Sequence, residues 1–79
     1  MMKLEKTERG FGRTEFVDRY GSECSLQKSS LATEDCIWFG VHKSFVKGDK
    51  SSTRMHLTQD MVKELLPFLK KFVKTGELE

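Results

Sequence analysis

The chain has 79 residues, of which 37% are hydrophobic and 33% are charged, and its net charge at pH 7 is +2. This length supports a single small domain, residues 1–79. A net charge this close to zero does not by itself indicate a nucleic-acid-binding protein. The first residues are rich in charge and lack the apolar core of a signal peptide, and no apolar run is long enough to cross a membrane. We therefore expect a cytoplasmic protein that does not bind membranes and whose two cysteines are reduced.

The N-terminal part is predicted to form an antiparallel hairpin after a flexible start. Residues 1–10 show no hydrophobic periodicity and are expected to be flexible. Residues 13–20 and 24–28 have the alternating pattern of half-buried strands. Gly21 supplies the turn between these two strands.

The most apolar segment is predicted to be a central strand. It covers residues 36–42, with the sequence CIWFGVH. Alternation places Ile37 and Phe39 on one face of this strand and Cys36 and Trp38 on the other. Apolar side chains on both faces are typical of a strand that is covered on both sides. A polar loop over residues 43–52 is then expected to lead into a short last strand.

A long amphipathic helix is predicted at the C-terminal end. Thr58 has a suitable side chain for the N-cap, and Gly76 is placed to end the helix in the left-handed conformation. Pro67 falls on the polar side, where we expect a bend in one continuous helix. The apolar residues that recur at helical spacing are Met61, Val62, Leu65, Leu66, Leu69, Phe72 and Val73.

The order of these elements, β-β-β-β-α, predicts an α+β fold. It consists of a small antiparallel sheet of about four strands with the amphipathic helix packed on one face. One helix covers only one side of a sheet, so either Trp38 or Phe39 should lie on the open side. An exposed apolar patch of this kind is typical of a partner-binding or self-association site, and a homodimer is expected.

The segment between residues 43 and 54 is basic and contains one aromatic residue. Cations next to an aromatic ring can hold a phosphate, a nucleotide or a nucleic acid, although an ordinary solvated loop has the same composition. The candidate binding residues are therefore Trp38, Phe45, Lys43, Lys47, Lys50 and Arg54.

Motifs for metal binding and catalysis are weak in this sequence. Cys24, Cys36, His42 and His56 are metal-ligand types, but their spacing lacks the close pairs of structural zinc sites. A Cys–His nucleophile would lack an orienting group at recognisable spacing. Residues 9–16, RGFGRTEF, match part of an RNA-recognition octamer. That octamer occupies an internal strand of its own fold, whereas here the residues lead into the first predicted strand. We therefore predict no catalytic residues, no metal, no cofactor and no enzymatic activity.

Two blocks of the sequence resemble a group of small proteins encoded by bacteriophages and prophages. They are DRYGSECSLQKSSLATEDCIWFGV, residues 18–41, and TRMHLTQDMVKELLPFLKKFVKTGEL, residues 53–78. The group has no assigned activity, so the resemblance implies only a setting, the cytoplasm of an infected bacterium. By analogy with small phage accessory proteins, we expect a non-enzymatic protein that binds, and so inhibits, a host or anti-phage defence protein. The alternative is a binder of an anionic small molecule, nucleotide or nucleic acid through residues 43–54.

Overall fold

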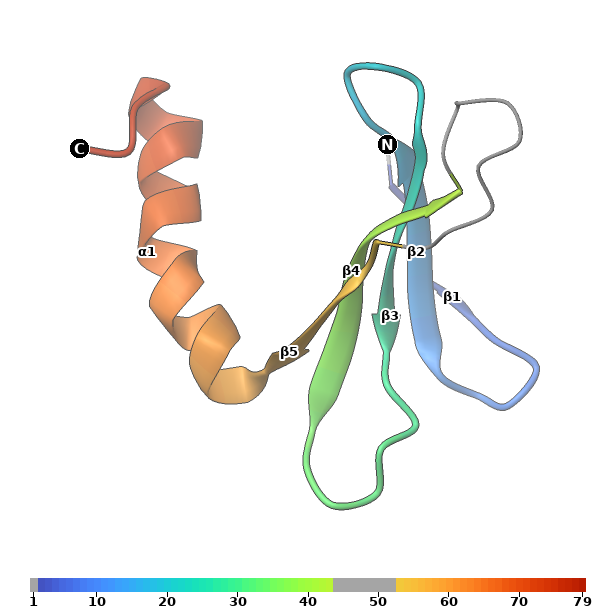
Figure 1. The fold of residues 1–79 in the computed structure, drawn as a ribbon. Coiled ribbons are helices and arrows are strands. Elements are labelled where there is room, and N and C mark those ends of the chain that lie inside the picture. The colour runs from blue at the N-terminus through green and yellow to red at the C-terminus, as the bar shows by residue number, and fades with distance from the viewer. Residues whose placement is uncertain (1, 44–52) are drawn as a thin grey trace.

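The computed structural model describes residues 2–43 and 53–79, and within them it has five strands and one helix (Figure 1). The elements are β1 (Glu5–Lys6), β2 (Gly12–Val17), β3 (Glu23–Lys28), β4 (Cys36–Lys43), β5 (Met55–Thr58) and α1 (Gln59–Thr75). The strands form one antiparallel sheet in the order β1-β2-β3-β4-β5, and the C-terminal helix packs against it. The predicted α+β fold is confirmed.

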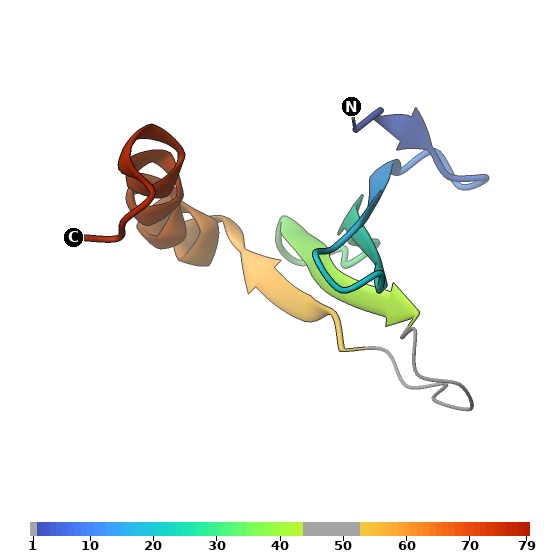
Figure 2. The ribbon, with the colours of Figure 1, turned by 90° about the horizontal axis from the view of Figure 1, so that it is seen from above.

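The sheet has one strand more than the four that the sequence predicts. The additional strand is β1, a two-residue segment in the part of the chain that was expected to be flexible. Glu5 pairs with Arg13 and Lys6 with Gly12, so β1 extends the edge of the sheet beyond β2. Seen from above, β1 and the helix lie at opposite ends of the sheet (Figure 2).

The strand register divides the side chains between two faces. Leu26 pairs with Phe39, and Ile37 pairs with Leu57, so these residues share what we call the apolar face. On the same face the rings of Phe16 and Phe39 are 6.0 Å apart. The opposite face, which we call the polar face, carries Arg13, Ser25, Gln27, Trp38, Arg54 and His56.

The helix begins and ends where the sequence predicts. The Thr58 hydroxyl accepts a hydrogen bond from the backbone N–H of Met61 at 3.2 Å, so Thr58 is the N-cap. Gly76 has a φ of 79° and its N–H donates to the carbonyl of Phe72 at 2.8 Å. Pro67 lies inside this single helix, as expected.

Only part of the apolar stripe of the helix packs against the sheet. Its main contact is with β5, the strand that leads into it. A hollow of about 170 Å³ separates the helix from the apolar face. It is lined by Val62, Leu65 and Leu69 of the helix and by apolar-face residues such as Leu26 and Phe39. No residue of the helix is buried. The helix therefore lies to one side of the sheet (Figure 1), and the hollow between them leaves part of the apolar face uncovered.

The fully buried interior is small. Among the described residues, the buried hydrophobic side chains are Cys24 and Cys36, each 4% exposed. Both are free thiols, as the sequence predicts. Ser25 has no exposed surface at all, so the centre of the sheet is packed with small side chains.

Candidate functional site

Trp38 stands at the centre of the polar face and is held there by its neighbours. It lies directly opposite His56 on β5, and the two rings are stacked with centroids 4.0 Å apart and planes 11° apart. His56 in turn shares a hydrogen bond of 2.9 Å between its Nε2 and the hydroxyl of the buried Ser29. On its other side Trp38 faces Gln27 of β3. Neighbours on both adjacent strands, β3 and β5, thus hold the indole in place without a ligand.

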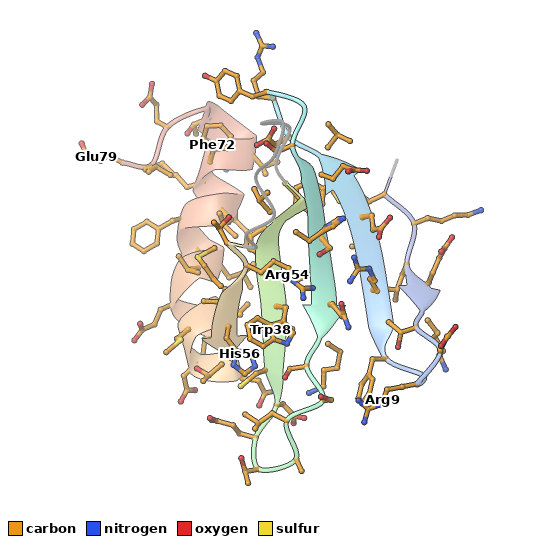
Figure 3. All side chains as sticks on the ribbon, turned by 45° about the vertical axis from the view of Figure 1, so that its right-hand side comes forward. Arg9, Trp38, Arg54, His56, Phe72 and Glu79 are labelled. Carbon is orange, nitrogen blue, oxygen red and sulfur yellow. The ribbon has the colours of Figure 1, made fainter. Side chains whose placement is uncertain are left out.

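Two arginines meet on the side chain of Gln27. Arg54 Nη1 donates to Gln27 Oε1 at 3.1 Å and lies 3.4 Å from the Ser25 hydroxyl. Arg13 Nη1 donates to the same Gln27 oxygen. The Arg54 guanidinium carbon is also 5.6 Å from the centre of the Trp38 ring, a cation–π distance. Figure 3 shows Arg54, Trp38 and His56 together on this face.

The positive charge of these arginines is only partly balanced. Arg13 forms an ion pair with Glu15 at 3.0 Å. Within the described residues no carboxylate pairs with Arg54, and its Nε is buried without a hydrogen-bond acceptor there. Burial first, and then the neighbouring charge of Arg13, lower the pKa of Arg54, although a guanidinium stays protonated at neutral pH. An anion beside Arg54 would offset the repulsion between its charge and that of Arg13.

A hollow of about 360 Å³ adjoins Trp38. Gln27, Ser30 and Trp38 line one side, and the β1–β2 turn lines the rest with Thr7, Glu8, Arg9 and Phe11. The Arg9 guanidinium is 5.8 Å from the centre of the Phe11 ring. The volume is within the range of small-molecule sites, which runs from about 300 to about 1,000 Å³. The hollow therefore offers two aromatic rings, an arginine and an amide to a ligand, with Glu8 as its acidic member.

The β1–β2 turn that carries Arg9 and Phe11 is well fixed. The Thr7 N–H donates to the Phe11 carbonyl at 2.8 Å, and the Gly10 N–H donates to the Thr7 carbonyl at 2.8 Å. The Thr7 hydroxyl accepts from the Phe11 N–H at 3.1 Å. Gly10 has a φ of 86°, which a side chain would make unfavourable.

The structure brings together two of the six predicted site residues. Trp38 and Arg54 lie on the same face and within cation–π distance of each other. The side chain of Lys43 and the residues Phe45, Lys47 and Lys50 lie outside the described residues. Sequence reasoning missed Gln27 as a site residue. It considered Arg9 and Arg13 only as part of the octamer at residues 9–16, and His56 only as a metal-ligand type. Alternation could have placed Gln27 and His56 on the Trp38 face, but it does not show which residues are neighbours across strands.

The described residues also bear on catalysis. Among them no group of three His, Cys, Asp or Glu side chains could hold a metal ion. Burial raises the pKa of both thiols, and nearby carboxylates add to this, Asp18 for Cys24 and Glu34 for Cys36. Thiols of this kind are weak nucleophiles at neutral pH.

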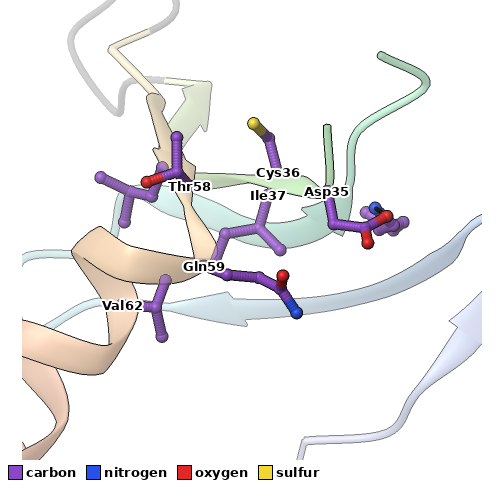
Figure 4. Close-up of a pocket in the computed structure, with 8 residues that line it drawn as sticks. Asp35, Cys36, Ile37, Thr58, Gln59 and Val62 are labelled. Carbon is purple, nitrogen blue, oxygen red and sulfur yellow. Dashed lines mark hydrogen bonds and ion pairs between the residues drawn. The ribbon is translucent and has the colours of Figure 1, made fainter. Parts of the chain in front are cut away.

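A second hollow, of about 440 Å³, lies where the helix begins (Figure 4). It is lined by residues of β4, β5 and the first turn of α1, among them Cys36, Ile37, Thr58 and Val62. Its charged members, Lys28 and Asp35, pair with each other at 2.8 Å. This hollow therefore lacks an uncompensated charge of the kind found at Arg54.

Of the helices in residues 2–43 and 53–79, none has the length and apolar character needed to span a membrane. Comparison of the chain with protein-family models, with curated proteins and with solved structures gave no match.

Proposed function

We propose that the chain is a non-enzymatic binding protein whose polar face holds an anionic ligand with a flat ring, namely a nucleotide, free or within a single strand of nucleic acid. The observation that carries this proposal is Arg54. It is a partly buried cation without a carboxylate partner among the described residues, and it lies 5.6 Å from the ring of Trp38. A phosphate and a base are the two groups that such a pair accommodates together.

Each part of the ligand has a place on this face. The base stacks in the hollow beside Trp38, where base–aromatic stacking contributes about 1–3 kcal/mol. The phosphate lies near Arg54 and Arg13, which already converge on Gln27. His56 holds the indole from the opposite side, so little side-chain entropy is lost on binding.

A second candidate is a protein partner, and the composition of the same face favours it. Tryptophan and arginine dominate the residues that contribute most to protein–protein binding, and here they are held in place on an open face. The partner would present carboxylates to Arg54. The resemblance to phage-encoded proteins supports the bacterial cytoplasm as the setting and a host or anti-phage defence protein as this partner.

The chain has one tryptophan, so its fluorescence reports on this site directly. The probes are nucleoside monophosphates, single-stranded oligonucleotides, a nucleoside without phosphate, a sugar phosphate without a base, and polyglutamate. We expect saturable quenching by the nucleotides or oligonucleotides, weakened by added salt, and little effect from the two partial ligands.

The oligonucleotide and monophosphate arms separate nucleic acid from free nucleotide as the source of the ligand. Quenching by polyglutamate alone would favour the acidic protein partner. If no nucleotide or oligonucleotide changes the fluorescence at low salt, the nucleotide proposal is wrong.

A further inference from the structure

The chain exposes more surface than a compact protein of its size. Its accessible surface is 6887 Å², whereas a compact monomer of 9.2 kDa exposes about 4,900 Å². Its radius of gyration is 14.0 Å, against about 12 Å for a compact chain of this length. About 2,000 Å² is therefore exposed in excess of the expectation.

Exposed apolar side chains on the helix contribute to this excess. Phe68, Leu69 and Phe72 are each slightly more than half exposed, and Val73 is 85% exposed. Phe68, Phe72 and Val73 do not line the hollow between the helix and the apolar face. A helix with so broad an apolar side normally buries it against another element.

Beside the helix lies a groove. The hollows of about 170 and about 440 Å³ share three lining residues, Ile37, Leu57 and Val62, so they adjoin. One wall of this groove is α1 and the other is the apolar face of the sheet, as Figure 4 shows at the start of the helix. The groove and the exposed stripe of the helix are both lined mainly by apolar side chains, but α1 does not fill the groove of its own chain.

We propose that two copies of the chain associate through this surface, with α1 of each copy in the groove between α1 and the apolar face of the other. A two-fold axis lets one chain supply both the groove and the helix that fills it. Obligate homodimers bury about 2,000–5,000 Å² in total, and an excess of about 2,000 Å² on each chain suffices for such an interface.

The weak interior favours a second copy over a different protein. The buried hydrophobic side chains among the described residues are two cysteines, and a small domain with such a core is marginally stable. Another copy is present whenever the chain is made, so it can complete the fold at all times.

This surface differs from the one that the sequence suggested for self-association. The sequence placed the exposed apolar patch at Trp38 or Phe39, on whichever side the helix leaves open. In the structure Trp38 is on the polar face, whereas the groove lies on the opposite side of the sheet. A dimer formed through the groove leaves both polar faces accessible to ligands.

Sedimentation equilibrium of the full chain and three variants tests the proposal. We expect the wild type to sediment at twice 9.2 kDa. Phe72→Glu and Val73→Glu alter exposed side chains, so a monomer tolerates them, but each should weaken the dimer at least about tenfold. The matched control is Tyr20→Glu, because Tyr20 is 77% exposed in the β2–β3 turn and should leave the dimer unchanged.

The melting temperature of the wild type gives a readout that needs no variant. It should rise as the protein concentration increases from about 1 to about 100 µM, because association stabilises the folded state by mass action. A wild type that is monomeric, with a melting temperature independent of concentration, would overturn the proposal. Dissociation by Tyr20→Glu but not by Val73→Glu would equally overturn it, because the interface would then lie elsewhere.

Discussion

Gly40 controls how closely the segment leading into β5 approaches β4, and replacing it by alanine should loosen the polar face. Its φ is +140°, a region that residues with side chains rarely adopt. A Cβ at this position would lie 3.1 Å from both Arg54 Cα and the Thr53 carbonyl oxygen. Because those atoms belong to the backbone, the neighbouring segment must move.

The cost of Gly40→Ala follows from these two effects. Backbone strain of this kind costs about 1–3 kcal/mol, and displacing the hydrogen bond from Thr53 N–H to the Val41 carbonyl, 3.0 Å long, adds about 1 kcal/mol. We expect a loss of about 2–4 kcal/mol from a total stability of about 4–12 kcal/mol. Arg54 should also move away from Gln27.

Urea denaturation, followed by the fluorescence of Trp38, measures this loss. The matched control is Gly21→Ala, because Gly21 also has a positive φ, +91°, but a Cβ there meets nothing within 4 Å. Gly21→Ala should therefore show strain alone, about 1–2 kcal/mol. If Gly40→Ala costs no more than Gly21→Ala, the close approach of the two segments is not what positions Arg54.

Three further predictions concern local contacts. Thr58→Ala removes the acceptor for the Met61 N–H and should lower the free energy of unfolding by about 1 kcal/mol in urea titrations, whereas no change would mean that the cap is not used. The Lys28 ammonium lowers the pKa of Asp35, first by a hydrogen bond and then by its charge. The Lys28–Asp35 pair therefore stabilises the folded state at neutral pH, and this stabilisation is lost as the pH falls through the lowered pKa. An NMR titration should place the Asp35 pKa below its ordinary value, and Lys28→Met should raise it toward that ordinary value; an unchanged pKa in the variant would contradict this. Cys24 and Cys36 should react slowly with a thiol reagent at pH 7 until the chain is unfolded, because burial both shields them and raises their pKa, and rapid labelling of the native protein would be evidence against this burial.

The sequence predicts best those features that depend on a few neighbouring residues. Thr58 and Gly76 identify the ends of the helix because a capping hydroxyl and a left-handed glycine are local requirements. Alternation places Leu26 and Phe39 on faces that the structure shows to be shared. These are short-range effects, and tertiary contacts did not override them.

The candidate site depends on contacts that the sequence does not reveal. Arg13, Gln27 and Arg54 meet although 14 and 27 positions separate the two arginines from the glutamine. Alternation assigns each of them a face, but the strand register decides which of them touch, and loop geometry helps to set that register. The position of the helix relative to the sheet is equally unpredictable from the sequence. An apolar stripe indicates that the helix packs against some surface, but it does not indicate which one.

We propose above all that the polar face binds an anionic ligand with a flat ring through Arg54 and Trp38. The most direct measurement is the Trp38 fluorescence titration with the best-binding nucleotide or oligonucleotide, repeated on Arg54→Met and on the control Arg19→Met. Both arginines carry the same charge, but Arg19 is exposed in the β2–β3 turn, whereas Trp38 pairs with Gln27 near the opposite end of β3. We predict that Arg54→Met weakens binding about tenfold or more, as loss of charge-assisted hydrogen bonds requires, while Arg19→Met changes it little. Equal weakening by the two variants would show that only overall charge matters and would contradict the claim.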